Sequence, residues 1–320
     1  MVARITRLLI LLQCAFGLGV FFAAVKLLQI QNYWLAAGLA VGVVLLGRLS
    51  ITANSFLLAW LYRSETPSQF QIDWRQASRL FRSEFNATMI SSSWSMAFRS
   101  FEKRLSSTPR GLPVLLIHGY GCNSGYWHWM SKRLGKAHIT HHAVNLEPVL
   151  TDIDNYVATI SRAVDTLAAE TGSAQVIIVA HSMGGLASRA YLRDHGDRHI
   201  AKVITLGTPH GGTGLANHGA GENSRQMRRE PANGGSPSAW LRALEASESA
   251  AIRHLFVSIY SHHDNIVAPQ ISSHLAGATN IQIQGVGHVA MALNNDVQEL
   301  VIEHILSTTG RQTPTTFAEA

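Results

Sequence analysis

A serine in the middle of the chain has the neighbours that a nucleophile needs. The segment 180–185 reads AHSMGG, follows the apolar run 175–180 and is followed by a helical pattern. A serine in a sharp strand-to-helix turn requires small residues two positions before and after it, and Ala180 and Gly184 meet this requirement. A serine that only caps a helix would not need them. We therefore predict that Ser182 is a nucleophile at a helix N-terminus, where developing negative charge is stabilised.

A serine nucleophile needs a base, and the base needs an acid to orient it. In a turn of this kind the chain order is serine, acid, histidine. Asp264 follows the apolar run 255–260, and His288 follows the run 280–284 in a glycine-rich segment. Both lie where a strand ends, which is the edge at which open α/β sheets bind ligands. We predict that Asp264 orients His288 and that His288 takes and returns the Ser182 proton.

Other histidines and acids compete for these roles. The chain contains 16 histidines, so position has to decide between them. His262 and His263 adjoin Asp264, and we interpret them as residues that pack the loop. Asp197 is a competing acid, but it follows the helix after the serine directly and therefore comes too early in the fold.

A carbonyl under attack also needs two backbone N–H groups aimed at its oxygen. Met183 follows the nucleophile and supplies one, and we expect Tyr120, in the segment 118–122 (HGYGC), to supply the other. Cys122 is an alternative nucleophile, but it lacks the tight turn. The residues that we expect to support these groups are His118, which braces the loop, Gly119, Gly121, His181 and Gly184.

Aromatic residues gather beside this loop. Their side chains would form either the wall of an apolar acyl pocket or part of the ordinary core, and the sequence leaves both interpretations open. The histidine pairs 141–142 and 262–263 are adjacent and lack the spacing of zinc ligands, so we expect neither a metal nor a cofactor. The aromatic residues are Tyr120, Tyr126, Trp127 and Trp129.

Apolar runs that alternate with helical patterns must position these residues. Such alternation predicts a mostly parallel sheet with helices on both faces. The segment 208–238 is rich in glycine and polar residues and predicts a long loop, either a lid or a disordered insertion. The expected strands are 113–118, 175–180, 200–206, 255–260 and 280–284. The expected helices are 151–170, 183 to about 194, and 289–307. The first helix begins with a capping box from Thr151 to Asp154 and stops at Gly172, and the second stops at Gly196.

The first 62 residues differ from the rest in composition. They carry four charged residues, all basic, and two long apolar stretches, Leu8–Leu28 and Tyr33–Tyr62, separated by a turn at 29–32. About 20 apolar residues suffice to span a bilayer, so we predict a transmembrane helical hairpin. A signal peptide would explain the first stretch but not the second. Arg48 near the middle of the second stretch costs about 2.5–3.5 kcal/mol, which a long tilted helix or a break into a re-entrant and an interfacial segment would relieve.

The distribution of charge indicates the side of the membrane. Basic residues precede and follow the hairpin, which places both of its ends and the rest of the chain in the cytoplasm, at the inner membrane. If Arg48 split the second stretch into two spans, the rest of the chain would lie outside the cytoplasm. Beyond residue 62 the 22 basic and 20 acidic residues nearly balance, so nothing indicates a nucleic-acid-binding face.

Composition limits the remaining possibilities. Charged residues make up 14% of the 320, against about 25% in a typical soluble domain, and the two cysteines exclude a disulfide scaffold. We expect a membrane segment at 1–62, an amphipathic connector without chemistry at 63–110, a catalytic domain at 111–307 and a flexible tail at 308–320. The apolar spacing that predicts a helix in the connector involves Ile72, Trp74, Ala77, Leu80, Phe81 and Phe85.

Three of these segments together resemble the α/β-hydrolase superfamily, and within it the bacterial lipases and esterases. Segment 118–121 looks like the oxyanion loop of that group, 180–185 is similar to its nucleophile turn with alanine in place of the first glycine, and 206–213 (LGTPHGGT) resembles the stretch after the next strand. The resemblance covers about residues 111–306 and implies the α/β-hydrolase fold. The secreted lipases have no counterpart of the N-terminal hairpin.

The resemblance implies a serine ester hydrolase that cleaves esters of apolar acyl chains, with a lipid or another apolar ester as substrate. The apolar N-terminal stretches add the membrane as its location. A phospholipase, a thioesterase or an acyltransferase would use the same three residues. A non-catalytic scaffold with the same fold would have no need of Ser182, Asp264 and His288 together.

Overall fold

A central sheet of seven strands organises the chain. The computed structural model describes residues 1–230 and 235–310. The strand order is β1-β3-β2-β4-β5-β8-β9, and every neighbouring pair is parallel except β1 and β3. This confirms the mostly parallel sheet. The strands are β1 (Lys103–Arg104), β2 (Val114–Ile117), β3 (His141–Val144), β4 (Val176–His181), β5 (Ile200–Leu206), β8 (Phe256–Ser261) and β9 (Thr279–Ile283).

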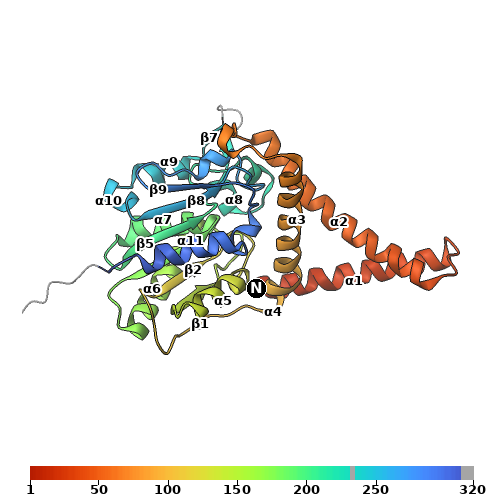
Figure 1. Cartoon of the computed structure of the whole chain (residues 1–320), viewed down its shortest axis with the longest axis horizontal. Helices are drawn as coiled ribbons and strands as arrows, with labels where there is room; N and C mark the ends of the chain where they lie inside the picture. Colours follow the sequence, from red (N-terminus) through yellow and green to blue (C-terminus); the bar gives the residue numbers. More distant parts are fainter. Residues whose placement is uncertain (231–234, 311–320) are drawn as a thin grey trace, which may run out of the picture.

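Both faces of the sheet are covered by helices, as predicted (Figure 1). Successive residues of a strand point to opposite faces, so Leu115 and Ile117 join one apolar cluster and Val114 and Leu116 the other. The first cluster contains the inner faces of α6 (Val157–Thr171), α7 (Met183–His195) and α9 (Ala239–Ala246). The second contains those of α5 (His128–Lys136) and α11 (Asn295–Leu306). Strands buried on both sides must be apolar throughout, which explains the uninterrupted apolar runs.

Two predicted helices begin differently in the structure. The helix expected at 151–170 starts as a 3₁₀ turn, η4 (Ile153–Tyr156), and its cap is Asp152, which accepts the N–H of Asp154 at 2.8 Å. The predicted capping box from Thr151 to Asp154 is therefore wrong, because Asp152, and not Thr151, accepts the backbone N–H of Asp154. The expected stops at Gly172 and Gly196 are confirmed, with φ of 65° and 69°.

The helix expected at 289–307 is divided. A 3₁₀ turn, η8 (Val289–Ala292), comes first, and α11 begins only after Asn294. The side chain of Asn294 accepts the N–H of Val297 at 3.1 Å and so restarts the helix with a new cap.

The segment 208–238 is not a long irregular loop. Residues 231–234 lie outside the described structure, as do residues 311–320 of the expected tail. The described parts of the segment contain short elements because polar side chains bond backbone groups within it, as Ser224 does by donating to the carbonyl of Ala216 at 2.9 Å. These elements are η5 (Gly214–His218), α8 (Glu222–Gln226), β6 (Arg229–Glu230) and β7 (Ser236–Pro237).

Two long N-terminal helices form the predicted hairpin. These are α1 (Val2–Lys26) and α2 (Tyr33–Tyr62), and both are long and apolar enough to cross a membrane. A signal sequence would pass the same test at the position of α1. The α2 helix is continuous, so there is no break at Arg48, and of the two arrangements that would relieve its cost the structure adopts the long helix.

The connector contains a third long helix, which lies between the hairpin and the sheet (Figure 1). It is α3 (Trp74–Ile90), continued by the π-helical turn η2 (Ser91–Ser95) and the short α4 (Met96–Phe98). The predicted amphipathic helix is therefore present, although Ile72 precedes it. Asp73 caps α3 in a reciprocal capping box with Gln76.

A buried ion pair fixes α7 to the segment before α10 (Ala250–Arg253). Arg189 donates to Glu248 twice, at 2.6 and 2.8 Å, and both side chains are only 1% exposed. A two-point arginine–carboxylate contact of this kind holds both groups in one orientation.

We predict that Arg189→Leu lowers the free energy of unfolding by about 3 kcal/mol, because it leaves the Glu248 carboxylate buried without its main partner. Thermal unfolding in detergent should show a fall in Tm of roughly 6–12 °C for a domain of this size. Arg193→Leu is the control, since Arg193 on the same helix is 27% exposed and pairs with partly exposed acids. Equal falls in the two variants would contradict the prediction.

Candidate active site

Ser182 lies in a strained turn between β4 and α7. Its backbone has φ of 54°, a value that non-glycine residues rarely adopt. The turn has no space for a side chain two residues after the serine, because a Cβ on Gly184 would lie 2.5 Å from the carbonyl oxygen of Ile117. Two hydrogen bonds hold the turn: the Ser182 N–H donates to the Leu206 carbonyl, and the Thr208 hydroxyl donates to the Ser182 carbonyl, both at 2.9 Å. The side chain is thus raised above the end of the sheet.

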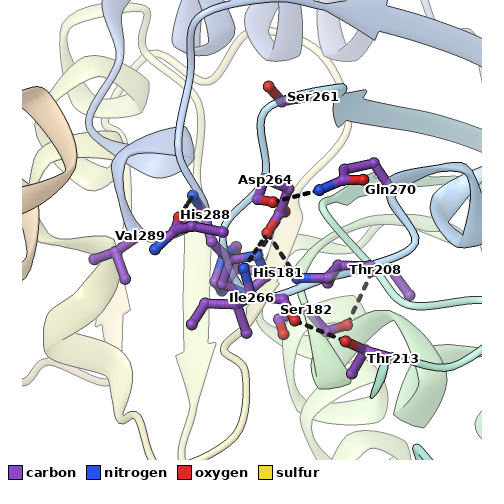
Figure 2. Close-up of polar contacts among 12 residues, drawn as sticks. His181, Ser182, Thr208, Thr213, Ser261, Asp264, Ile266, Gln270, His288 and Val289 are labelled. Carbon is purple, nitrogen blue, oxygen red and sulfur yellow. Dashed lines mark hydrogen bonds and ion pairs between the residues drawn. The ribbon is translucent and has the colours of Figure 1, made fainter. Parts of the chain in front are cut away.

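Asp264 and His288 form a buried pair beside this serine (Figure 2). His288 Nδ1 and Asp264 Oδ2 are 2.7 Å apart. The other carboxylate oxygen accepts the N–H groups of Ile266 and Val267, at 2.8 and 2.7 Å. With the Nδ1 proton donated to the carboxylate, a neutral ring carries its free lone pair on Nε2. That is the tautomer that a general base needs.

The three loops that carry these residues meet at Gly207. A Cβ there would lie 3.0 Å from Asp264 Oδ2 and 3.2 Å from His288 Nδ1, and Gly207 adjoins the carbonyl that accepts the Ser182 N–H. The described contacts include no hydrogen bond from Ser182 Oγ to His288 Nε2. Bonds of this kind often tighten only in the complex with substrate. The structure therefore brings the three predicted residues together, and their catalytic roles stay a prediction.

The charges around His288 favour its protonated form. Burial opposes protonation, but the Asp264 carboxylate and the more distant Glu84 outweigh it, so the pKa of His288 is raised above its ordinary value. His181 behaves differently, because burial and the neighbouring His288 place its pKa well below the usual range. Burial likewise lowers the pKa of His118 to about 4. One histidine of the three is thus poised to accept a proton, and the other two stay neutral.

The two neutral histidines hold the loops in place. His118 Nε2 accepts the N–H of Leu146 at 3.0 Å, which leaves Nδ1 to donate to the Gly119 carbonyl at 2.9 Å. His181 Nε2 donates to the carbonyl oxygen of His288 at 3.0 Å, and the two rings are 4.5 Å apart. Both residues therefore support the site by fixing backbone positions.

The expected oxyanion loop lies against the serine. A Cβ on Gly119 would be 2.8 Å from Ser182 Cβ, so the backbone passes the nucleophile at contact distance. Gly121 has φ of 66°, which glycine adopts without strain. Met183 is the first residue of α7, where amides have no acceptor within the helix. The amides of Tyr120 and Met183 stay our candidates for binding the oxyanion.

Comparison with known proteins identifies the fold. Residues 113–239 match a protein-family model described as alpha/beta hydrolase fold. The structure of the mature form of the Bacillus licheniformis lipase BlEst2 is similar to 64% of this chain and 97% of its own, at 19% identity and a TM-score of 0.51. This chain has the α/β-hydrolase fold. Aspergillus fumigatus lipase B has 19% identity and a TM-score of 0.54 over 68% of this chain, but over only 58% of its own length.

The aromatic residues expected beside the oxyanion loop do not all lie in one place: some are in the core, and one lines a cavity. Tyr126 and Trp127 are fully buried in the core on the α5 side, as the core interpretation expected. Trp129 packs near Trp94, with ring centroids 6.2 Å apart. Tyr120 lines a large cavity beside the oxyanion loop. Its hydroxyl donates to the carbonyl of Ala220 at 2.8 Å.

The structure does not favour the competing nucleophile and the competing acid for this candidate site. Burial raises the pKa of the Cys122 thiol to about 12, so the thiolate that a cysteine nucleophile requires is not formed near neutral pH. Asp197 follows α7 at the end opposite Ser182. Residues 1–230 and 235–310 contain no group of three or more His, Cys, Asp or Glu residues arranged to hold a metal.

Sequence reasoning missed a carboxylate that holds the histidine loop. Glu84, on α3, is fully buried and accepts the N–H groups of Val289 and Ala290, at 3.0 and 2.9 Å. Burial raises the pKa of Glu84, although these two donors oppose the shift. The sequence did contain a signal for this residue: a charged side chain, Glu84, lies between Leu80 and Ala87 on the apolar face of the predicted helix.

Two amides after β8 complete the support. Asn265 Oδ1 accepts the N–H of His288 at 2.9 Å, and its Nδ2 donates to Ser55 of α2 at 2.8 Å. Gln270 donates to the Asp264 carbonyl at 2.9 Å and accepts the N–H of Ser64 at 3.2 Å. The second N-terminal helix and the residues directly after it therefore contact the loop that carries Asp264.

We predict that Glu84→Gln lowers the pKa of His288, because the variant removes a negative charge that favours the imidazolium. Reaction of Ser182 with a fluorophosphonate requires neutral His288, so the rate rises as pH passes through the pKa of His288. The midpoint of this rise should move to lower pH, as a profile of labelling rate against pH would measure.

Glu222→Gln is the matched control for this profile, since Glu222 is exposed and pairs with Arg225. If Glu84 only stabilised the loop, the variant would label more slowly at every pH and the midpoint would not move.

Proposed function

We propose that this protein is a serine ester hydrolase of the lipase or carboxylesterase type, which cleaves esters of apolar acyl chains through an acyl-enzyme on Ser182. One observation carries the proposal. A serine in a strained strand-to-helix turn lies beside a buried histidine whose Nδ1 is 2.7 Å from a buried carboxylate. That set of groups, in that chain order on an α/β-hydrolase fold, is the arrangement that activates a serine hydroxyl.

In the first half of the reaction, His288 Nε2 takes the proton from Ser182 Oγ as the oxygen attacks the ester carbonyl. The negative charge moves to the carbonyl oxygen, where the N–H groups of Met183 and Tyr120 stabilise it. The intermediate then breaks its bond to the leaving alcohol, which receives the proton from His288. The acyl group remains on Ser182.

In the second half, water replaces the alcohol. His288 takes a proton from the water as it attacks the acyl-enzyme, and the same amides stabilise the second oxyanion. Collapse returns the proton to Ser182 and releases the fatty acid. Asp264 stays ionised throughout and stabilises the imidazolium in both halves.

The proposed location is the inner membrane, with the catalytic domain in the cytoplasm. Two apolar helices and the basic residues at both ends of the hairpin support it. Ser55 of α2 bonds Asn265, and Ser64, just after α2, bonds Gln270. These bonds support a second helix that remains part of the working enzyme, because its removal would leave both amides without these partners.

We predict that Ser182→Ala abolishes hydrolysis of p-nitrophenyl esters, with a fall in kcat of about 10⁴-fold or more, because the nucleophile is gone. The measurement uses the detergent-solubilised full-length protein and a series of esters from short to long acyl chains. Fluorophosphonate labelling should disappear in the same variant.

Two variants serve as controls. Ser188→Ala changes a buried serine of the same helix whose hydroxyl bonds the Gly184 carbonyl, and Cys122→Ala removes the competing thiol. Both should keep labelling and turnover. Labelling that survives in Ser182→Ala would contradict the proposed nucleophile, and labelling without turnover on any ester would indicate a different acceptor, such as that of an acyltransferase.

We also predict that a reporter fused after the last residue is active only as a cytoplasmic reporter. A C-terminal green fluorescent protein should fluoresce, and a C-terminal alkaline phosphatase should be inactive. The opposite pattern would place the catalytic domain outside the cytoplasm.

A further inference from the structure

A cavity of about 680 Å³ separates the N-terminal helices from the oxyanion loop. It lies among the first half of α1, the middle of α2, the second half of α3 and the loops after β2 and β3. Its lining is mainly apolar and includes Ile5, Ile51, Phe85 and Met89. The volume falls in the range of about 300–1,000 Å³ that is typical of ligand sites.

One end of this cavity lies against the expected oxyanion loop. Tyr120 and Gly121 form part of its wall. These residues directly follow Gly119, whose backbone lies against Ser182. A chain that occupied the cavity would therefore place its terminal carbonyl beside the nucleophile and the amide of Tyr120.

The other end continues into the hairpin. The legs α1 and α2 separate toward the sheet, with α3 across the opening (Figure 1). A second apolar cavity, of about 510 Å³, lies between the legs and shares Ile10, Gln13, Arg48 and Met89 with the first. The outer faces of both legs expose apolar side chains such as Leu12 and Leu46. Apart from the residues at the level of Arg48, apolar surface thus extends from the membrane-facing helices to the oxyanion loop.

A polar contact marks the border between the two cavities. Arg48 Nε donates to Gln13 Oε1 at 2.7 Å, and Arg48 Nη1 donates to Ser92 Oγ at 3.1 Å. These bonds join α1, α2 and η2 at one level. Gln13 and Ser92 line the first cavity with Arg48, so the far end of that cavity is polar whereas its walls are apolar.

We propose that the first cavity binds the acyl chain of a membrane lipid, which enters sideways between α1 and α2, and that the contact among Arg48, Gln13 and Ser92 limits the chain length. The proposal rests on the proposed ester hydrolysis and adds its substrate class. An acyl chain is the occupant that fits a mainly apolar lining between membrane-facing helices and the oxyanion loop beside Ser182.

Thr52→Trp tests the cavity, since Thr52 is buried, lines it and would fill it with an indole. The quantity measured is the ratio of kcat/KM for hexadecanoyl to that for butanoyl p-nitrophenyl esters, in the full-length protein in detergent. Each methylene kept out of an apolar site lowers binding by about fourfold, so the ratio should fall by about tenfold or more. Leu46→Trp is the matched control, because Leu46 is 61% exposed on the same helix and lines neither cavity.

Arg48→Met provides a second, independent test. It removes the polar border and joins the two cavities, so the preferred acyl length should increase. A short-chain fluorophosphonate that still labels Ser182 shows that each variant is folded and has an accessible nucleophile.

The outcomes separate the two proposals. Two results would overturn the acyl cavity, provided that the short-chain probe still labels Ser182. They are an unchanged kcat/KM ratio in Thr52→Trp and an unchanged chain-length optimum in Arg48→Met. Neither result would contradict the proposed ester hydrolase. If the wild-type protein neither hydrolyses the butanoyl ester nor reacts with the short probe, the proposed hydrolase itself fails. If the short-chain probe does not label Thr52→Trp, that variant is not folded or its nucleophile is not accessible, and the chain-length optimum of Arg48→Met alone tests the acyl cavity.

Discussion

The position of one imidazole ring is the constraint on which the site depends. A general base must have one ring nitrogen bound to a carboxylate and the other free, and the backbone that carries the ring must not move. Asp264 provides the first condition, with Nδ1 and Oδ2 2.7 Å apart. The second is met from several directions at once: His181 donates to the His288 carbonyl, Asn265 accepts the His288 N–H, and Glu84 accepts the next two amides. Strands β4, β8 and β9 and helix α3 therefore all converge on a single residue.

Those parts of the site that depend on local sterics could be predicted from the sequence. The turn at Ser182 admits only small residues nearby, because a Cβ on Gly184 would meet the backbone of β2, and this requirement leaves a local pattern in the chain. The helix ends at Gly172 and Gly196 are predictable for the same reason, since both residues have positive φ. The apolar strands were predictable because burial on two faces removes the polar alternation. The fold could therefore be predicted from these local requirements and from the resemblance of three short segments to α/β-hydrolases.

The parts that depend on distant partners could not be predicted. Strand β3 begins with His141 and His142, which do not look like a buried strand. They are buried because His141 pairs with Ser131 at 2.7 Å and His142 with Glu170 at 3.0 Å. Glu84 posed the same difficulty, since its two donors are more than 200 residues away in the chain. A buried polar group is favourable only with its partner, and one sequence does not name that partner.

The same contacts change how the N-terminal helices should be understood. A helix that only holds a domain near a membrane has no reason to donate to or accept from the loops of the active site. Here Ser55 of α2 accepts from Asn265, and the N–H of Ser64, just after α2, donates to Gln270, so two bonds fix the loop that carries Asp264. Each buried group left without its partner costs about 1–3 kcal/mol. Removing the helices would therefore loosen the loops that fix His288, and the positions of these loops depend on residues that the hydrolase fold itself does not supply.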